Sequence, residues 1–158
     1  MAVTEIERIR AELKSGQRLL GLDIGSKTIG LALSDVSAML ASPAETIRRT
    51  KFTKDVVRLK EIIAEEDVGG LVLGLPVSMD GTEGPRCQST RDFATNLLQH
   101  IDLPIAFWDE RLSTAAVQRV LIKEADMTRK RQGEVVDKMA AAYILQGALD
   151  AMKGMAAG

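Results

Sequence analysis

The sequence is poor in the residues that support disulfide, thiol or histidine chemistry. It contains one cysteine, Cys87, and one histidine, His100, in 158 residues. A single cysteine excludes an internal disulfide and a cysteine-rich zinc site, and it agrees with a reducing cytoplasm. One cysteine and one histidine are weak grounds for a catalytic pair, so the simpler interpretation of Cys87 is a passive thiol.

Aromatic residues, long apolar runs and net charge are also scarce. Aromatic residues make up 3% of the chain, which argues against a surface that stacks on nucleic-acid bases. The longest apolar stretch, residues 68–77, is too short to span a bilayer, and residues 1–14 alternate charged and apolar side chains instead of forming a signal core. We therefore expect a cytoplasmic protein with no membrane partner. The net charge of −1 means that local basic patches would have to hold any polyanion.

The length and the 46% hydrophobic content fit one compact domain, and hydrophobic spacing predicts its elements. We divide the chain into an N-terminal helical extension (1–16), one domain (17–153) and a flexible tail (154–158). Two apolar runs around Gly25-Ser26-Lys27 predict a hairpin of buried strands. The predicted elements are a short helix from Val3 that stops at Ser15-Gly16, strands at 18–24, 28–34 and within 44–49, a helix at 53–66, a buried strand at 71–75, a helix at 85–100, a strand at 104–108, a helix at 114–124, a polar basic loop, and a helix at 134–152.

Strands followed by alternating helices and strands predict an α/β layered fold, with an antiparallel side from the hairpin and a parallel side from the crossovers. In such sheets reactive groups gather outside the carboxyl ends of the strands. Asp23 ends the first strand of the hairpin and Glu110 follows the fifth strand. Asp137 is placed in the first turn of the last helix, where it can point towards the same sheet edge. The three carboxylates are therefore expected to converge.

Each of these carboxylates also has a simpler explanation. Asp23 could cap the turn that follows it, Glu110 could pair with Arg111, and Asp137 could be a helix-start charge favoured by the helix dipole. Taken together, three gathered carboxylates would repel one another unless divalent cations screened them. The pattern predicts two Mg²⁺ or Mn²⁺ ions bound by the three acids. Such a pair of ions hydrolyses phosphodiester bonds without histidine or cysteine.

Four ordered blocks carry a family resemblance: Gly21-Leu22-Asp23-Ile24-Gly25 with 29–35, Gly74-Leu75-Pro76 with Met79-Asp80-Gly81, 109–114, and Val136-Asp137-Lys138 with Ala140-Ala141 and 144–146. In these blocks, and over nearly all of the chain after Arg18, the sequence resembles the YqgF/RuvX family. The resemblance implies a ribonuclease-H-like three-layer fold, with a five-stranded mixed sheet of order 3-2-1-4-5 and helices on both faces. It places the catalytic acids on Asp23, Glu110 and Asp137.

The resemblance also implies a nuclease acting on structured nucleic acid. The first candidate activity is 5′-end processing of pre-16S ribosomal RNA in ribosome biogenesis, and the alternative is resolution of branched DNA (Holliday) junctions. A junction resolvase is expected to be a homodimer, whereas an RNA-end nuclease can act as a monomer.

Basic residues and one loop are candidates for substrate contacts. A cluster at 129–131 immediately precedes the Asp137 helix, although basic clusters are usually solvated surface. The turn-rich segment 74–84 leaves a strand at the acidic edge, and it is either a substrate loop or an ordinary connector. The candidate nucleic-acid contacts are Lys27, Arg86, Arg111, Arg129, Lys130, Arg131 and Lys138, and the candidate loop residues are Pro76, Asp80 and Gly81.

Two other functions fit parts of the sequence. The Asp23-Ile24-Gly25 signal on a hairpin also opens the actin-like and sugar-kinase ATPases, but those proteins need two such domains around a nucleotide cleft. A non-catalytic RNA-binding assembly factor could keep the fold and hold one structural metal. The three intact acids favour chemistry, because clustered carboxylates destabilise an empty site and offer a pure binding module no evident gain.

Overall fold

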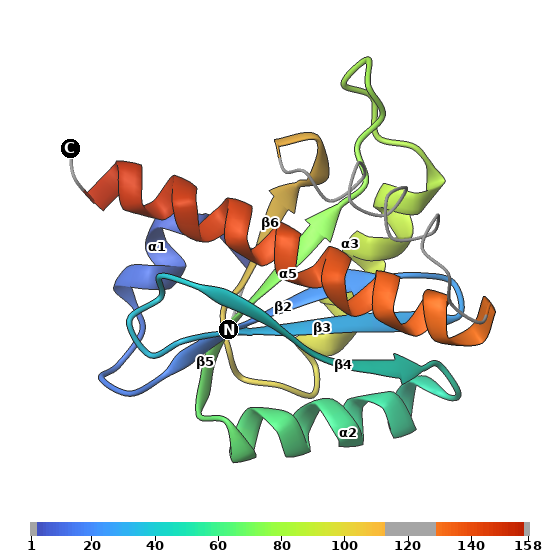
Figure 1. Cartoon of the computed structure of the whole chain (residues 1–158), viewed down its shortest axis with the longest axis horizontal. Helices are drawn as coiled ribbons and strands as arrows, with labels where there is room; N and C mark the ends of the chain where they lie inside the picture. Colours follow the sequence, from blue (N-terminus) through green and yellow to red (C-terminus); the bar gives the residue numbers. More distant parts are fainter. Residues whose placement is uncertain (1–2, 113–128, 157–158) are drawn as a thin grey trace.

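A computed structural model describes residues 3–112 and 129–156 and shows one mixed sheet with helices on both faces (Figure 1). The six strands lie in the order β1-β6-β5-β2-β3-β4. The elements are β1 (Val3–Thr4), α1 (Ile6–Ala11), β2 (Arg18–Ile24), β3 (Thr28–Ser34), β4 (Ala41–Arg48), α2 (Phe52–Glu65), β5 (Val68–Leu75), α3 (Pro85–Leu97), β6 (Ile105–Asp109), the 3-10 helix η1 (Glu110–Leu112) and α5 (Arg129–Ala156).

The five strands predicted from the sequence form the body of the sheet in the predicted order. β2 pairs antiparallel with β3 and β3 with β4, while β5 runs parallel to both β2 and β6. Numbered along the chain without β1, this arrangement is 3-2-1-4-5, so the ribonuclease-H-like fold is confirmed. The sixth strand is new: Val3–Thr4 pairs in parallel with the outer edge of β6.

The N-terminal segment is part of this architecture. The helix predicted to begin at Val3 begins at Ile6, because residues 3 and 4 are extended along β6. The side chain of Ile9 is fully buried, and it packs so closely on β5 that a Cβ added at Gly70 would lie 2.8 Å from it. Strand β1 thus adds an edge strand to the sheet, and α1 covers part of one face.

Each face of the sheet has its own apolar core. One core is built from α2 and α3, with Leu59 and Leu97 among its buried side chains. The other is built from α1 and α5, with Ile9 and Leu145. Every residue of β5 is buried, as expected for a continuous apolar strand covered on both sides. Within the described residues, none of the helices combines the length and the apolar content that a membrane span needs.

The last helix differs most from the prediction. α5 begins at Arg129 instead of Glu134, so residues 129–131 are helical and do not form a loop. Asp137 consequently lies about two turns inside the helix, where the dipole of the helix end no longer explains its presence. The helix continues to Ala156, into the segment predicted to be a flexible tail. The helix predicted at 114–124 lies outside the described residues.

Candidate active site

Asp23 lies near the carboxyl end of β2 with only 6% of its surface exposed. It is paired across the hairpin with Gly30 of β3. Directly paired residues project to the same face of a sheet, and residues two apart on a strand do so as well. A Cβ at Gly21, two residues before Asp23, would lie 2.8 Å from Leu145 of α5. The Asp23 side chain therefore belongs to the face that α5 covers.

Asp137 reaches the same place because α5 lies directly on β3. A Cβ at Gly30 would be 2.1 Å from the Asp137 carbonyl oxygen, so only glycine allows this approach. The Thr28 hydroxyl then donates a hydrogen bond to Oδ2 of Asp137. Helix α5 thus sets the Asp137 backbone over the residue opposite Asp23, and the start of β3 orients its carboxylate.

Glu110 comes from the other side of the sheet. It opens η1, immediately after β6. Its Oε1 would lie 2.8 Å from a Cβ placed at Gly74 of β5, a position that also faces Ile144 of α5. Since β5 lies between β6 and β2, the Glu110 side chain extends over β5 towards the strand that carries Asp23.

The structure therefore brings the three acids to one face and one end of the sheet. Glu110 lies over β5, Asp23 is on β2 and Asp137 lies over β3, which are consecutive strands in the sheet. Neighbouring strands are about 4.8 Å apart. Among the described residues, no three acidic, histidine or cysteine side chains are close enough to hold a metal ion together. The donors suit Mg²⁺ or Mn²⁺, which prefer carboxylate oxygens, but they are spread over three strands.

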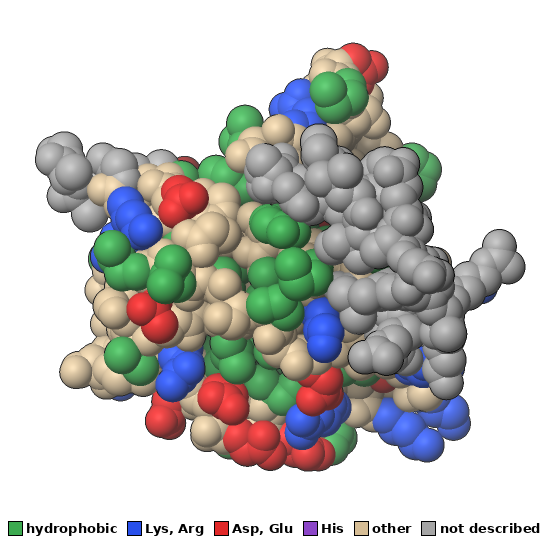
Figure 2. Space-filling model, in the orientation of Figure 1, with side chains coloured by type: hydrophobic (Ala, Val, Ile, Leu, Met, Phe, Trp, Pro, Cys, Tyr) green, Lys and Arg blue, Asp and Glu red, His purple; other side chains and the backbone are tan. Residues whose placement is uncertain are grey.

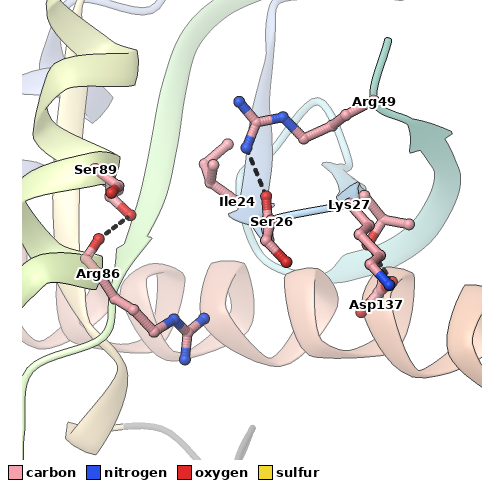
Figure 3. Close-up of a pocket in the computed structure, with 10 residues that line it drawn as sticks. Ile24, Ser26, Lys27, Arg49, Arg86, Ser89 and Asp137 are labelled. Atoms are coloured by element: carbon pink, nitrogen blue, oxygen red, sulfur yellow. Dashed lines mark hydrogen bonds between the residues drawn. The ribbon is translucent and has the colours of Figure 1, made fainter.

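A pocket of about 470 Å³, lined mostly by polar and charged residues, adjoins this acidic face (Figure 3). Arg86 extends from α3 towards α5, across the pocket from Lys27 and Arg49. Lys27 and Arg86 were predicted as substrate contacts, and Arg49 was not. The lining residues are Ile24, Gly25, Ser26, Lys27, Thr28, Arg49, Arg86, Ser89, Thr90 and Asp137.

The distribution of charge over the wider surface does not mark the position of this pocket. Basic and acidic side chains are interspersed over the visible described part of the α5 face (Figure 2). The basic residues that line the pocket therefore form a local group on a chain whose net charge is −1.

Arg111 has a different partner from the one considered at first. Its guanidinium forms an ion pair with Asp109, with 2.7 Å between Nη2 and Oδ2, and its Nε contacts both oxygens of the same carboxylate. These hydrogen bonds lower the pKa of Asp109 and raise that of Arg111. The pair proposed as the simpler explanation of Glu110 is thus made by Asp109.

The segment after β5 is a hydrogen-bonded turn that projects from the body of the molecule (Figure 1). Pro76 directly follows β5. Asp80 Oδ1 accepts hydrogen bonds from the backbone N–H and the hydroxyl of Thr82, which lower the pKa of Asp80. Gly81 has φ +89°, a conformation that favours glycine. These contacts explain Asp80 and Gly81 as turn residues, while a role in substrate binding remains a prediction.

The remaining candidates separate into two groups. Lys138 is half-buried in α5, with its backbone nitrogen 3.1 Å from a Cβ placed at Gly30. The side chains of Arg129, Lys130 and Arg131 lie outside the described part of the structure. Their expected contact with nucleic acid stays a prediction.

Cys87 and His100 show no sign of a catalytic pair. Cys87 is fully buried, and burial raises the pKa of its thiol, which disfavours the reactive thiolate. The His100 ring packs instead on Phe52, with 5.7 Å between the ring centroids. The interpretation of Cys87 as a passive thiol agrees with this geometry.

Known proteins are similar to this chain over nearly its whole length. The model of the RuvX family, described as Holliday junction resolvase, matches residues 17–151. A protein of Paramagnetospirillum magneticum named “Putative pre-16S rRNA nuclease” is 64% identical over 99% of this chain and 100% of its own length. A protein of the same name from Phenylobacterium zucineum is 56% identical over 98% and 100% of the two chains.

Solved structures agree with the fold. RuvC of T. thermophilus in complex with a Holliday junction substrate superimposes with a TM-score of 0.54 at 14% identity, covering 87% of this chain and 96% of that protein. The yeast mitochondrial Holliday junction resolvase Ydc2 gives a TM-score of 0.52 at 12% identity, covering 96% and 86%.

Proposed function

The chain belongs to the RuvX family, and from this premise we propose that it is a hydrolase of phosphodiester bonds in structured nucleic acid, which processes the 5′ end of the pre-16S ribosomal RNA. The placement of Asp137 against Gly30, opposite Asp23, is the observation that carries the proposal. It joins two acids from distant parts of the sequence at the edge of a basic pocket. The family match over 17–151 includes the hairpin motif, so this motif is not a sign of an ATPase.

We assign the metal-binding and catalytic roles to Asp23, Glu110 and Asp137. They would hold one or two divalent ions, Mg²⁺ or Mn²⁺, and such ions supply an activated water and stabilise the leaving oxygen. Asp23 is the central residue, because its strand lies between those beneath Glu110 and Asp137. Thr28 orients Asp137 by donating a hydrogen bond from its hydroxyl to the carboxylate. The burial of Asp23 excludes bulk water from its side of the site.

The proposed substrate is recognised through its backbone and shape. The basic groups at the site can bind phosphates, whereas aromatic side chains for base stacking are few in this chain. Trimming of an RNA end cuts one strand and needs one active site, so a monomer suffices. Symmetric cutting of a junction would need a homodimer.

The test is cleavage of an end-labelled RNA with the 5′ extension of pre-16S RNA and of a four-way DNA junction, in Mg²⁺, Mn²⁺ or EDTA. Wild-type protein is compared with Asp23→Asn and with the control Asp102→Asn. Asp102 is an exposed acid that lies before the start of β6, whereas Glu110 follows the end of that strand. We expect metal-dependent cutting of the RNA that is lost in Asp23→Asn and kept in Asp102→Asn.

Other outcomes correct the proposal in different ways. Cutting of the junction alone would change the substrate to branched DNA. Binding of RNA without any cutting would favour an assembly factor that holds RNA. An active Asp23→Asn protein would remove the proposed acidic centre.

A further inference from the structure

Three basic side chains from separate segments converge on the pocket beside Asp137. Lys27 lies in the β2–β3 turn, Arg49 follows β4, and Arg86 is in the first turn of α3. Asp137 is the one acidic residue among those that line the pocket. The lining is therefore positive next to a site assigned to hydrolysis of a polyanion.

Arg49 is held in place before any ligand arrives. Its Nη1 donates a hydrogen bond of 2.6 Å to the Gly25 carbonyl oxygen, and its backbone N–H donates one of 2.8 Å to the Lys27 carbonyl. The guanidinium also stacks on Phe93, 5.5 Å from the ring centroid. An immobilised guanidinium loses little side-chain entropy when it binds. The donors that Gly25 does not occupy keep a fork geometry that matches phosphate.

The hydroxyl groups around the pocket are largely occupied within the protein. Ser89 and Thr90 donate to the carbonyl oxygens of Pro85 and Arg86, and Thr28 donates to Asp137. The basic groups are thus the main means of binding a ligand. Helix α3 contributes Arg86, Ser89 and Thr90 to the lining from its first two turns.

We infer that Arg49, together with Lys27 and Arg86, binds one backbone phosphate of the cleaved strand, next to the phosphate that is hydrolysed. This inference rests on the proposed function, because it takes the ligand to be a nucleic-acid strand. The neighbouring position follows from Asp137, which lines the pocket and also belongs to the acidic face. Arg49 is a positioning residue, since it would hold the nucleic-acid strand and it also hydrogen-bonds to Gly25 in the turn that follows Asp23.

Binding without metal tests the pocket separately from hydrolysis. The probe is a fluorescein-labelled RNA hairpin with a single-stranded 5′ extension, together with copies in which one linkage at a time is a neutral methylphosphonate. Affinities are measured in EDTA by anisotropy over a range of salt. For wild type we expect one linkage whose neutralisation weakens binding about tenfold, as loss of a charged hydrogen bond should.

The variants then assign that linkage to Arg49. Arg49→Ala should bind the unmodified probe about tenfold more weakly, lower the salt slope by about one, and be insensitive to the linkage that matters in wild type. Lys60→Ala, an exposed basic residue of α2, is the control and should behave as wild type. If Arg49→Ala does not fold, Lys27→Ala and Arg86→Ala carry the same test, because their side chains are exposed.

Each contrary result is distinct. The proposal is wrong if Arg49→Ala binds the RNA probe as tightly as wild type. It is also wrong if the variant binds more weakly but is still sensitive to the same neutral linkage as wild type. If millimolar orthophosphate displaces the RNA probe as effectively as unlabelled RNA does, the pocket binds a small anion and not a nucleic-acid strand. If the protein cleaves RNA but no single methylphosphonate weakens binding, the phosphate-binding proposal is wrong and the nuclease proposal stands. If one methylphosphonate weakens binding but no RNA is cleaved, the phosphate-binding proposal stands and the nuclease proposal is wrong.

Discussion

The Thr28 hydroxyl donates a hydrogen bond to the carboxylate of Asp137, a residue 109 positions further along the chain. Thr28 begins β3, immediately after the turn that follows Asp23. The hydrogen bond therefore joins the hairpin that carries one acid to the helix that carries another. Loss of the Thr28 hydroxyl should therefore alter the direction of the Asp137 carboxylate.

Thr28→Val tests this link, since it removes the hydroxyl at nearly constant volume. We expect kcat for RNA cleavage to fall about tenfold, the value of one hydrogen bond to a charged group, with little change in KM. Thr95→Val in α3 also removes a hydroxyl, one that donates to a helix carbonyl, and it should keep full activity. An equal loss of activity in both variants would contradict a specific role for Thr28.

Gly30 should tolerate no side chain, because a Cβ there would lie 2.1 Å from a backbone atom of α5. Backbone cannot move aside as a flexible side chain can, so we expect Gly30→Ala to lower the free energy of unfolding by about 3 kcal/mol or more. Gly84→Ala is the matched control, as nothing lies within 4 Å of its Cβ position. Urea unfolding of the two variants gives the comparison, and similar losses would contradict the close contact.

Divalent ions should stabilise the folded protein if the three acids bind them. Binding to the folded state alone adds about 2.7 kcal/mol at a concentration one hundred times Kd. We expect Mg²⁺ or Mn²⁺ to raise the unfolding midpoint of wild type and of Asp102→Asn, but not that of Asp23→Asn. NaCl at equal ionic strength controls for general screening. A shift that persists in Asp23→Asn would place the ions elsewhere.

Much of the fold could be predicted because its signals are local. The β2–β3 hairpin was found with its observed bounds, since Gly25-Ser26-Lys27 interrupts two apolar runs. Strand β1 was missed because two residues carry no periodicity, and their extended form depends on pairing with β6. The start of α5 was placed late because the polar segment before Glu134, with Gly133, has the composition of a loop.

The candidate site was less accessible from the sequence. The three acids were found through the strand ends and the family blocks, but the Thr28 hydroxyl bond depends on how α5 crosses β3. Arg49 was overlooked because it follows another arginine at the end of a strand. Alternation alone does not tell which of the two side chains faces the pocket; the contacts of Arg49 with Gly25 and Phe93 do.

The ion pair between Glu45 of β4 and Arg58 of α2 predicts a pH-dependent part of the stability. Arg58 Nη2 lies 2.7 Å from Glu45 Oε1, and Nε contacts the other oxygen at 2.9 Å. These hydrogen bonds hold the pKa of Glu45 below its usual 4.5. A carboxyl whose pKa is lowered by folding stabilises the protein above the unfolded pKa, and this contribution is lost as the pH falls through the folded pKa. Both side chains are more than a third exposed, so solvent screening limits the effect to about 1 kcal/mol or less.

Glu45→Gln should therefore lower the free energy of unfolding at pH 7. Wild type and variant should converge at an acid pH below the folded pKa of Glu45, where the protonated glutamate is neutral like the glutamine that replaces it. Urea unfolding at the two pH values measures the difference. High salt at pH 7 should also reduce it, because the pair is partly exposed to solvent. A difference that is the same at both pH values would show that Glu45 contributes through packing and not through its charge, since packing does not titrate.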